Sequence, residues 1–397
     1  MNISATLSGI RIARVSTVPF FVVAQLKTQI ASLARQGAQV TVITSDEPEL
    51  SLLEGLTGVT CVPIDIPRSI SPWRDLLALR QLFIFFKREN IHITHSTTPK
   101  AGLLTALAAF FAGVPVRLHT FTGQPWITMY GAKRWLARAG DKLIGKLNTR
   151  CYADSPGQRQ FLVAQRLVSA KQLFVIGSGS LAGVDVRRFD RRRFSGSQRE
   201  ALRRTLGIPD DAPVVLFVGR IAVDKGVREL LRAFSLLKGA GSNAHLILVG
   251  RLDTESGVQG AILPSDISGL LDVHVVGHTE SPEEFLAIAD LLCLPSYREG
   301  FGTVIIEAAA MSVPAVGTDI YGLSDAVVQG ETGLLVPPRN ISELENAIRK
   351  LIEDKSLRLR MGEAARRRVL VHFDAGIFDM QVAEEYRSLL LDEFKPE

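Results

Sequence analysis

The stretch LLCLPSYREGFGTVIIE, residues 291–307, decides how this chain folds, because it places a strand, a turn and a helix start in succession. Its first four residues form a short apolar run typical of a buried strand. Gly300 and Gly302 mark the turn, and the apolar residues that follow favour a helix. Glu299 precedes that helix and Glu307 lies one turn inside it. A strand that leads directly into a helix predicts a parallel sheet covered by helices.

The start of this helix is suited to an anion. Backbone N–H groups near Gly302 and Thr303 would point outward there, where the helix dipole favours negative charge. The carboxylates of Glu299 and Glu307, eight residues apart, could accept hydrogen bonds from sugar hydroxyls while the amides bind phosphate. The stretch therefore predicts a site for a phosphate-bearing sugar.

Short β-rich runs alternate with helical patterns along the chain in two series, which predicts an α/β fold with two parallel sheets. The runs of the first series are 10–15, 40–43, 91–94, 114–118 and 151–153. Those of the second series are 214–218, 245–249, 273–276, 291–294 and 314–316. The boundary is expected between Gly177 and Arg193, where glycines precede an arginine run and indicate a linker. A final helical stretch begins near Phe378.

A second informative segment, GRIAVDKG at residues 219–226, follows the strand at 214–218. Gly219 ends that strand, so Arg220 emerges at the carboxyl edge of the sheet and Lys225 follows on the same loop. Open α/β sheets bind ligands at this edge. The two cations could therefore clamp a diphosphate and stabilise the charge that a departing nucleoside diphosphate develops.

Taken together, the Glu-x7-Glu pattern and GRIAVDKG resemble the retaining glycosyltransferases of family 4. Further matching segments are Ser155-Pro156 with Gln158, GVD at 183–185, Ala289-Asp290 before the 295–297 turn, and GETGLLV at 330–336. The resemblance spans most of the chain. It implies the GT-B fold, in which two Rossmann-like, doubly wound domains face each other across a cleft. Residues 1–185 would bind the acceptor, 186–375 the nucleotide-sugar donor, and 376–397 would form a helix packing back on the first domain.

The same resemblance implies the reaction: transfer of a hexose or N-acetylhexosamine from a nucleotide diphosphate sugar, UDP-linked, with retention. Arg220 and Lys225 would replace a metal, which agrees with the lack of an Asp-x-Asp motif and of metal-ligand spacing among His and Cys. Glu299 would orient the donor sugar and Glu307 would hold the ribose hydroxyls. Neither would be a nucleophile, because family members are thought to use front-face attack. No cofactor is expected beyond the nucleotide-sugar co-substrate.

Other donor-binding residues are expected where strands of the second sheet end. Gly250-Arg251 and Gly277-His278-Thr279 end two of these strands and would border the nucleotide base. The predicted donor-binding set comprises Gly219, Arg251, Thr279, Phe301, Gly302, Thr303 and Glu307.

The first domain departs from the commoner family pattern. Many relatives carry a histidine directly before a glycine in a cleft loop, and that histidine is assigned to the donor sugar. Here the loop HTFTGQPW, residues 119–126, puts Thr122 before Gly123, and His119 comes three residues earlier. His119 either substitutes for the missing histidine as a catalytic residue or simply ends its strand. Thr122 and Gly123 are expected to bind the acceptor.

Two further acceptor-binding residues are expected in the first domain. His95, in HSTTPK at residues 95–100, matches a common family segment and is either an acceptor ligand or a hydrogen-bonded core histidine. Thr17 follows the first strand in place of paired glycines and could donate to a phosphate or an acceptor.

Charge is unevenly distributed, although the net charge is only +5. Residues 1–190 hold 22 Lys and Arg against 11 Asp and Glu, whereas residues 191–397 hold 24 against 30. The segment at 131–147 combines five Lys and Arg with apolar residues at near-helical spacing, close to three aromatic residues. It is either a helix lying on anionic lipid or a solvated helix whose apolar stripe packs on the sheet. Nucleic acid is not expected, because no recognised binding motif occurs.

The remaining expectations concern location and acceptor. Three widely separated cysteines, Cys61, Cys151 and Cys293, fit a reducing cytosol, and no apolar run is long enough to span a bilayer. Resemblance of residues 99–104 to bacterial capsule and O-antigen transferases suggests a lipid-linked saccharide acceptor at the inner face of the cytoplasmic membrane. Alternatives are a nucleotide-sugar 2-epimerase of the same fold, a glucan synthase with a soluble acceptor, and a nucleotide-sugar-binding module without catalysis.

Overall fold

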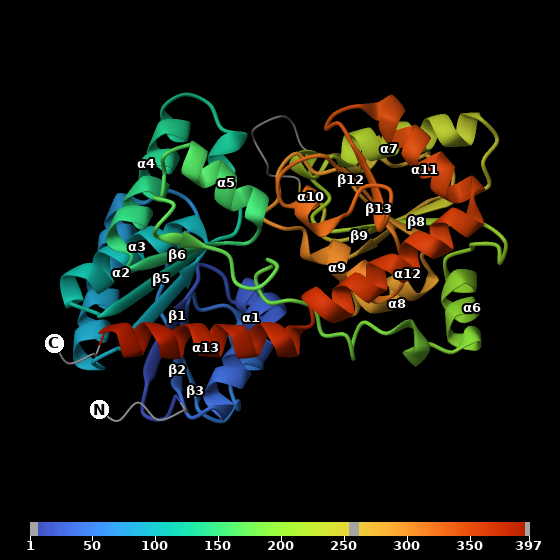
Figure 1. Cartoon of the computed structure of the whole chain (residues 1–397). Coiled ribbons are helices and arrows are strands. Elements are labelled where there is room, and N and C mark those ends of the chain that lie inside the picture. The colour runs from blue at the N-terminus through green and yellow to red at the C-terminus, as the bar shows by residue number, and fades with distance from the viewer. Residues whose placement is uncertain (1–6, 254–261, 394–397) are drawn as a thin grey trace. The chain divides into compact units, whose positions relative to one another are not determined.

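The computed structural model describes residues 7–253 and 262–393. It consists of two compact units (Figure 1). The N-terminal unit comprises Met1–Ala182 and Ala375–Glu397, and the C-terminal unit comprises Gly183–Asp374. The sequence placed the corresponding boundaries after residues 185 and 375. Residues 394–397 of the expected C-terminal helix lie outside the described residues.

The N-terminal unit has a parallel sheet in the strand order β3-β2-β1-β4-β5-β6-β7, which confirms the predicted α/β architecture. Its strands are β1 (Arg11–Val15), β2 (Gln39–Thr44), β3 (Val59–Pro63), β4 (Ile93–Thr97), β5 (Val116–Phe121), β6 (Arg150–Ala153) and β7 (Leu173–Phe174). The sequence analysis missed β3 and β7. Every residue of β3 is at least partly exposed and β7 has only two residues, so neither forms an apolar run.

Helices cover both faces of this sheet (Figure 1). They are α1 (Pro19–Arg35), α2 (Pro72–Arg88), α3 (Pro99–Ala112), α4 (Gly131–Leu147), α5 (Pro156–Ala164) and α13 (Ala375–Glu393), with 3-10 turns at Pro48–Leu52 and Pro125–Ile127. Four of them begin with proline, which fits the first helical turn because an N–H there lacks an intrahelical acceptor. Helices α2, α3 and α4 pack side by side.

Helix α13 starts three residues before the predicted position and packs against α1. Its buried residues Phe378, Val382, Tyr386 and Leu390 recur every four positions, so they form one stripe facing the sheet. The hydroxyl of Tyr386 accepts a hydrogen bond from Arg14 on β1 at 2.6 Å. The last helix of the chain is therefore part of the N-terminal core.

The C-terminal unit has a second parallel sheet in the order β10-β9-β8-β11-β12-β13. Its strands are β8 (Val214–Val218), β9 (His245–Val249), β10 (Val273–Gly277), β11 (Leu291–Leu294), β12 (Ala315–Thr318) and β13 (Gly333–Val336). Its helices are α6 (Gly196–Thr205), α7 (Val227–Gly239), α8 (Pro282–Ile288), α9 (Thr303–Ala310), α10 (Leu323–Ala326), α11 (Ile341–Glu353) and α12 (Lys355–His372). Short 3-10 turns lie at Arg191–Arg193, Val223–Lys225 and Pro264–Asp266. Only β13 was missed, because its sequence lies inside the GETGLLV motif.

The division between the units, after Ala182, lies within the predicted boundary region 177–193. The arginine-rich part of that region, residues 187–193, is however packed on the C-terminal unit and is not part of a linker. The guanidinium of Arg188 donates to both carboxylate oxygens of Glu283, at 3.0 and 2.8 Å. Arg366 on α12 lies 3.6 Å from Asp190. These ion pairs fix the stretch against helices α8 and α12.

Both sheets share one topological feature. In the first sheet the strand order reverses between β1 and β4, and in the second it reverses between β8 and β11. Loops on either side of such a switch point diverge to opposite faces of the sheet, which leaves room for a ligand at the carboxyl ends of the strands. Each unit therefore has one edge where a ligand is expected.

Candidate functional site

The switch point of the C-terminal unit is formed by two loops in close backbone contact. One loop, residues 219–226, follows β8, and the other, 295–302, follows β11. A Cβ added at Gly226 would lie 2.0 Å from the carbonyl oxygen of Pro295, and the φ of Gly226 is +69°. Only glycine fits this position, because a side chain would need both a left-handed backbone and space that Pro295 occupies. The approach places Lys225 directly beside the second loop.

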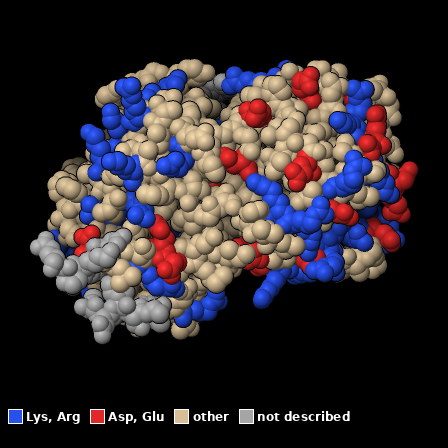
Figure 2. Space-filling model, viewed as in Figure 1, with Lys and Arg blue, Asp and Glu red and all other residues tan. Residues whose placement is uncertain are grey.

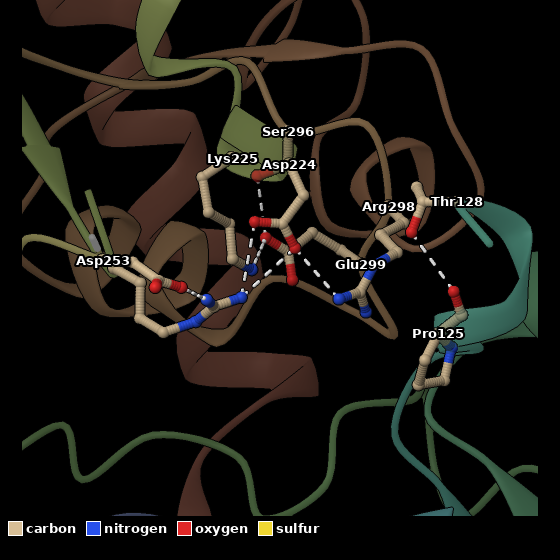
Figure 3. A network of polar contacts seen from close by, with 9 residues as sticks. Pro125, Thr128, Asp224, Lys225, Asp253, Ser296, Arg298 and Glu299 are labelled. Carbon is tan, nitrogen blue, oxygen red and sulfur yellow. Dashed lines mark hydrogen bonds and ion pairs between the residues drawn. The ribbon is translucent and has the colours of Figure 1, made fainter. Parts of the chain in front are cut away.

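Lys225 and Glu299 form an ion pair across these loops (Figure 3). The ammonium nitrogen of Lys225 lies 2.6 Å from Glu299 Oε1, and the Ser296 hydroxyl donates to the same oxygen at 2.8 Å. Both charged side chains are only partly exposed. Partial burial strengthens this pair relative to a surface pair, so the two groups hold each other in position.

A second group of charges is centred on Asp224 (Figure 3). Its Oδ2 accepts hydrogen bonds from Arg298 at 2.9 Å and from Arg220 at 3.2 Å. Arg220 also pairs with Asp253, which follows β9. The Arg220 side chain is half exposed, so its guanidinium can exchange these carboxylates for another anion. The sequence analysis considered Arg220 and Lys225 as a pair of cations facing a diphosphate; in the structure each is already paired with a carboxylate.

Helix α9 begins where the sequence predicted a helix start suited to an anion. Gly302 is its N-cap with a φ of 82°, and Thr303 is its first residue. Gly302 and Thr303 are both partly exposed. Phe301, expected among the donor-binding residues, is 2% exposed and its ring centroid lies 5.2 Å from that of Phe373. Only the backbone of Phe301 is therefore left to contact a ligand, because its side chain belongs to the core.

Glu307 lies on the second turn of α9, close to Arg188 and Glu283. Burial raises the pKa of Glu307 to about 7, and the negative charge of Glu283 acts in the same direction, whereas Arg188 opposes both. The carboxyl group is thus close to half-ionised at neutral pH. A ligand that donates hydrogen bonds would favour its ionised form.

The two residues expected to border the base lie at strand ends, as their positions require. Thr279 is partly buried after β10, and its hydroxyl accepts from the backbone N–H of Ser281 at 3.0 Å. Arg251 is exposed and follows Gly250 at the end of β9. A Cβ added at Gly250 would lie 1.8 Å from the carbonyl oxygen of Gly219, so the ends of β8 and β9 meet without a side chain between them.

In the N-terminal unit the two histidines are buried. His119 is 1% exposed within β5, its Nδ1 lies 2.9 Å from the Ser96 hydroxyl, and burial lowers its pKa to about 3. His95 lies between Arg14, Tyr386 and Thr120, at 2.9, 2.5 and 2.7 Å, and burial lowers its pKa well below the usual value. For His95 this geometry is that of the hydrogen-bonded core histidine, one of its two alternatives. His119 does not end its strand but lies within β5, where it is likewise buried and hydrogen-bonded.

The other expected acceptor residues lie at the carboxyl edge of the N-terminal sheet. Thr17 follows β1, and its hydroxyl lies 2.8 Å from that of Thr98, which follows β4 on the other side of the switch point. Thr122 and Gly123 follow β5; Thr122 is partly exposed, and Gly123 has a φ of 115°. These three residues therefore share one edge, and His95 and His119 lie below it inside the sheet.

Asp224, Ser296 and Arg298 belong to the charged network but were given no role from sequence. Asp224 was detectable, because Arg220 and Asp224 stand four residues apart within the motif that had already been singled out. Ser296 contacts Glu299, three residues along the chain, whereas Arg298 contacts Asp224, 74 residues away. Only the folded chain brings Arg298 to Asp224. Within residues 7–253 and 262–393, no group of three or more His, Cys, Asp or Glu side chains is arranged to hold a metal.

Comparison with known proteins gives the family. The model for glycosyl transferases group 1 matches residues 198–368, and that for the glycosyl transferase 4-like domain matches residues 22–179. The capsular polysaccharide biosynthesis glycosyltransferase CapM of Staphylococcus aureus is 30% identical over 92% of this chain and 94% of its own length. A Campylobacter jejuni enzyme, N,N'-diacetylbacillosaminyl-diphospho-undecaprenol alpha-1,3-N-acetylgalactosaminyltransferase, is 27% identical over 91% of this chain and 93% of its own.

Solved structures agree on the fold. A glycosyltransferase from Rickettsia africae superposes with a TM-score of 0.78 at 21% identity, covering 96% of this chain and 98% of its own. Anabaena HepE, in complex with UDP-glucose, also gives 0.78 at 22% identity and covers 96% and 100%. Two Rossmann-like units of this kind define the GT-B class. The chain belongs to the glycosyltransferases of family 4, as the Glu299–Glu307 and Gly219–Gly226 motifs predicted.

Proposed function

We propose that this protein transfers a hexose or N-acetylhexosamine, with retention and without a metal, from a UDP-sugar to a lipid-linked saccharide in surface polysaccharide synthesis. The observation that carries the proposal is the Lys225–Glu299 pair at the switch point, beside the start of α9. These two loops bring together a cation, a carboxylate and a helix N-terminus. The cation suits a diphosphate oxygen, the carboxylate suits a sugar hydroxyl, and the helix N-terminus suits a phosphate.

Each group has a distinct task in this proposal. Lys225 and Arg220 exchange their carboxylate partners for the diphosphate and stabilise the charge on the leaving β-phosphate oxygen. Glu299, released from Lys225 but still held by Ser296, orients the donor sugar. Glu307 accepts hydrogen bonds from the ribose. The leaving phosphate oxygen takes the acceptor's proton, so no protein nucleophile is needed.

The relatives support the substrate classes. The name of CapM refers to capsular polysaccharide, and that of the Campylobacter enzyme to a sugar carried on diphospho-undecaprenol. The Anabaena structure contains UDP-glucose. A UDP-sugar donor and a polyprenyl-diphosphate-linked acceptor are therefore the first pair to test.

The test is release of nucleoside diphosphate from UDP-, GDP- and ADP-sugars, in the presence of EDTA, with and without lipid-linked saccharides extracted from bacterial membranes. We expect release from a UDP-sugar only when the extract is present. Release without acceptor, accompanied by a new sugar epimer, would instead identify a 2-epimerase. Turnover on a soluble glucan would identify a glucan synthase, and donor binding without turnover would leave a binding module.

The outer surface of the N-terminal unit supports a membrane-bound acceptor. Helix α4 buries Asp141, Ile144 and Gly145, whereas Trp135 is 69% exposed and Leu136 is also exposed. Part of the apolar stripe of α4 therefore remains exposed after the helix has packed on the protein. Basic side chains gather over the part of this unit that carries α2 to α5 (Figure 2).

Helix α2, which packs against α3 as α4 does, also carries exposed apolar side chains. Trp73 is 72% exposed, and Leu76 and Leu77 are also exposed. Exposed aromatic and aliphatic side chains among lysines and arginines are typical of a surface that lies on anionic lipid. In the described residues no helix is long and apolar enough to cross a membrane. We therefore propose a peripheral contact through α2 and α4, at the cytoplasmic face where the donor is available.

Flotation with vesicles of phosphatidylglycerol and phosphatidylethanolamine tests this contact. The variant Lys133→Glu, Arg134→Glu, Lys142→Glu, Lys146→Glu should remain at the bottom of the gradient while the wild type floats. A matched control reverses four exposed charges of the C-terminal unit, Lys350, Lys355, Arg360 and Arg367, and should float. If the wild type does not float, or the α4 variant floats equally, the proposed membrane contact is wrong.

A further inference from the structure

A small group of buried polar residues lies where β5 and β6 of the N-terminal unit end. Gln158, on the first turn of α5, connects the two strand ends: its Oε1 accepts from the Asp154 backbone N–H at 2.7 Å, and its Nε2 donates to Gln124 at 3.4 Å. Ser155 caps α5 by accepting from the Gln158 N–H at 3.0 Å. These bonds fix the loops after β5 and β6 relative to each other.

Asp154 takes part in this arrangement only through its backbone. Its N–H donates to Gln158, and its carbonyl oxygen accepts from the Ser180 N–H at 2.6 Å. The residue is 5% exposed, and its Oδ1 has no hydrogen-bond partner among the described residues. The buried Oδ1 therefore contributes no hydrogen bond to the fold.

A second buried aspartate in the same unit shows the usual arrangement. Asp141 on α4 is 3% exposed, and its Oδ2 accepts a hydrogen bond from the Trp126 indole N–H at 2.7 Å. Burial raises the pKa of both carboxyls, to about 7 for Asp141 and about 8 for Asp154, but only Asp141 has a compensating donor. An uncompensated buried carboxyl costs stability, so its presence at a strand end indicates a function.

The chemistry at this point suits a neutral, hydroxyl-bearing ligand. A carboxyl that is protonated at neutral pH both donates and accepts a hydrogen bond, as a sugar hydroxyl does. Phe121 and Ala153 are aligned in the sheet, so Thr122 and Asp154 leave adjacent strands at the same level. Thr122 is partly exposed and follows β5 at the level at which Asp154 follows β6. A bare phosphate would find no cation among these groups.

We propose that Asp154, together with Thr122, binds a hydroxyl group of the acceptor saccharide at the carboxyl edge of the N-terminal sheet. This assignment rests on the proposed function, because it places the acceptor on this unit and the donor on the other. Asp154 is then a specificity-determining residue that contacts substrate and has no structural role.

The first experiment measures thermal stability, which requires no substrate. Asp154→Leu removes the uncompensated carboxyl and should leave the Tm unchanged or raise it by about 2–4 °C. Asp141→Leu is the matched control, and it should lower the Tm because Trp126 loses its partner. If Asp154→Leu lowers the Tm as much as Asp141→Leu does, the carboxyl is structural and the proposal is wrong.

The second experiment measures kinetics with the UDP-sugar and the membrane-extracted lipid-linked saccharides. Asp154→Leu and Thr122→Val should each raise the KM for the acceptor, by about tenfold for Leu, and leave the Kd for UDP unchanged. Asp154→Asn, whose amide also donates and accepts a hydrogen bond, should stay close to the wild type. An unchanged acceptor KM in Asp154→Leu, or a weakened Kd for UDP instead, would overturn the proposal.

These results distinguish failure of this proposal from failure of the proposed function. If the wild type shows no acceptor-dependent turnover, the glycosyl-transfer proposal fails, whatever the variants do. If the wild type turns over and Asp154→Leu behaves like it, only the acceptor role of Asp154 fails.

Discussion

The carboxyl edges of the two sheets have the same topology and opposite chemistry. At the switch point of the C-terminal unit, Lys225 pairs with Glu299 and Arg220 with Asp224. At that of the N-terminal unit, the corresponding contact joins the hydroxyls of Thr17 and Thr98. A strand reversal therefore provides only the place for a ligand, and the side chains at that place select a charged or a neutral one.

The difference follows from the cost of burial. Charged groups can remain partly buried in the C-terminal unit because each has an opposite charge within hydrogen-bonding distance. In the proposed function, an incoming diphosphate replaces the carboxylates as the partner of these cations, so that no cation is left unpaired. In the N-terminal unit the contact between Thr17 and Thr98 joins two neutral hydroxyls, and the buried Oδ1 of Asp154 has no hydrogen-bond partner among the described residues.

Loss of the cation at the charged edge should have the largest effect. Lys225→Ala should lower kcat by about 10²–10³, because the charge it supplies matters most when the diphosphate leaves. Lys238→Ala is a matched control: Lys238 is also paired, with Asp272, but at the amino end of the strands. It should retain wild-type kcat. Release of nucleoside diphosphate measures kcat for both variants. Unchanged turnover in Lys225→Ala would contradict the proposed role of the charged edge in binding the donor.

Separating the two loops of the charged edge should have the second-largest effect. Gly226→Ala places a methyl group 2.0 Å from the Pro295 carbonyl oxygen at a φ of +69°. We expect a loss of more than about 2 kcal/mol of unfolding free energy, from strain and displaced backbone. Urea denaturation measures it. Gly239→Ala, where an added Cβ meets nothing within 4 Å, should be neutral or slightly stabilising. Equal effects in the two variants would contradict the close approach.

The charged edge should also respond to pH. The pKa of Glu307 is raised to about 7, so the carboxylate that we propose accepts hydrogen bonds from the ribose becomes protonated as the pH falls below 7. The Kd for UDP should therefore rise below pH 7, by up to about tenfold per pH unit. Titration calorimetry between pH 5 and 8 measures the slope. Glu307→Gln cannot ionise, and its profile should be flatter; an identical profile would exclude Glu307 as the source.

The neutral edge should give the smallest effect. Thr17→Val removes one hydroxyl of the Thr17–Thr98 pair and should cost about 1 kcal/mol of stability. It should leave the Kd for UDP unchanged, since that ligand is assigned to the other unit. Denaturation and UDP titration on the same variant check both statements. Weaker UDP binding in Thr17→Val would mean that the two edges do not divide donor and acceptor as proposed.

Several parts of the fold could be predicted because they depend on local pattern. The strands at 214–218, 245–249 and 291–294 match β8, β9 and β11 residue for residue, since each is a short apolar run. Strand β3 has no buried residue and gave no such signal. The arginine stretch at 187–193 looked like a linker because its partner Glu283 lies far along the chain.

The candidate site was predictable to the same degree. Lys225 and Glu299 were both chosen from motifs, but their ion pair joins residues 74 apart and was not anticipated. His95 and His119 were possible ligands in the sequence, and their burial within β4 and β5 emerged only from the packed sheet. Asp154 gave no signal, because the absence of a hydrogen-bond partner is a property of its surroundings.

The sequence by itself determined the two α/β units, the family and the glycine-framed loops, because these depend on hydrophobic period and on residues whose backbone freedom is local. Only the tertiary structure decided which charges pair, which histidines are buried and where Asp154 is left uncompensated. It also decided that Trp135 and Trp73 remain exposed. Each of these depends on strand register and solvent exclusion, which are set by residues distant in the chain.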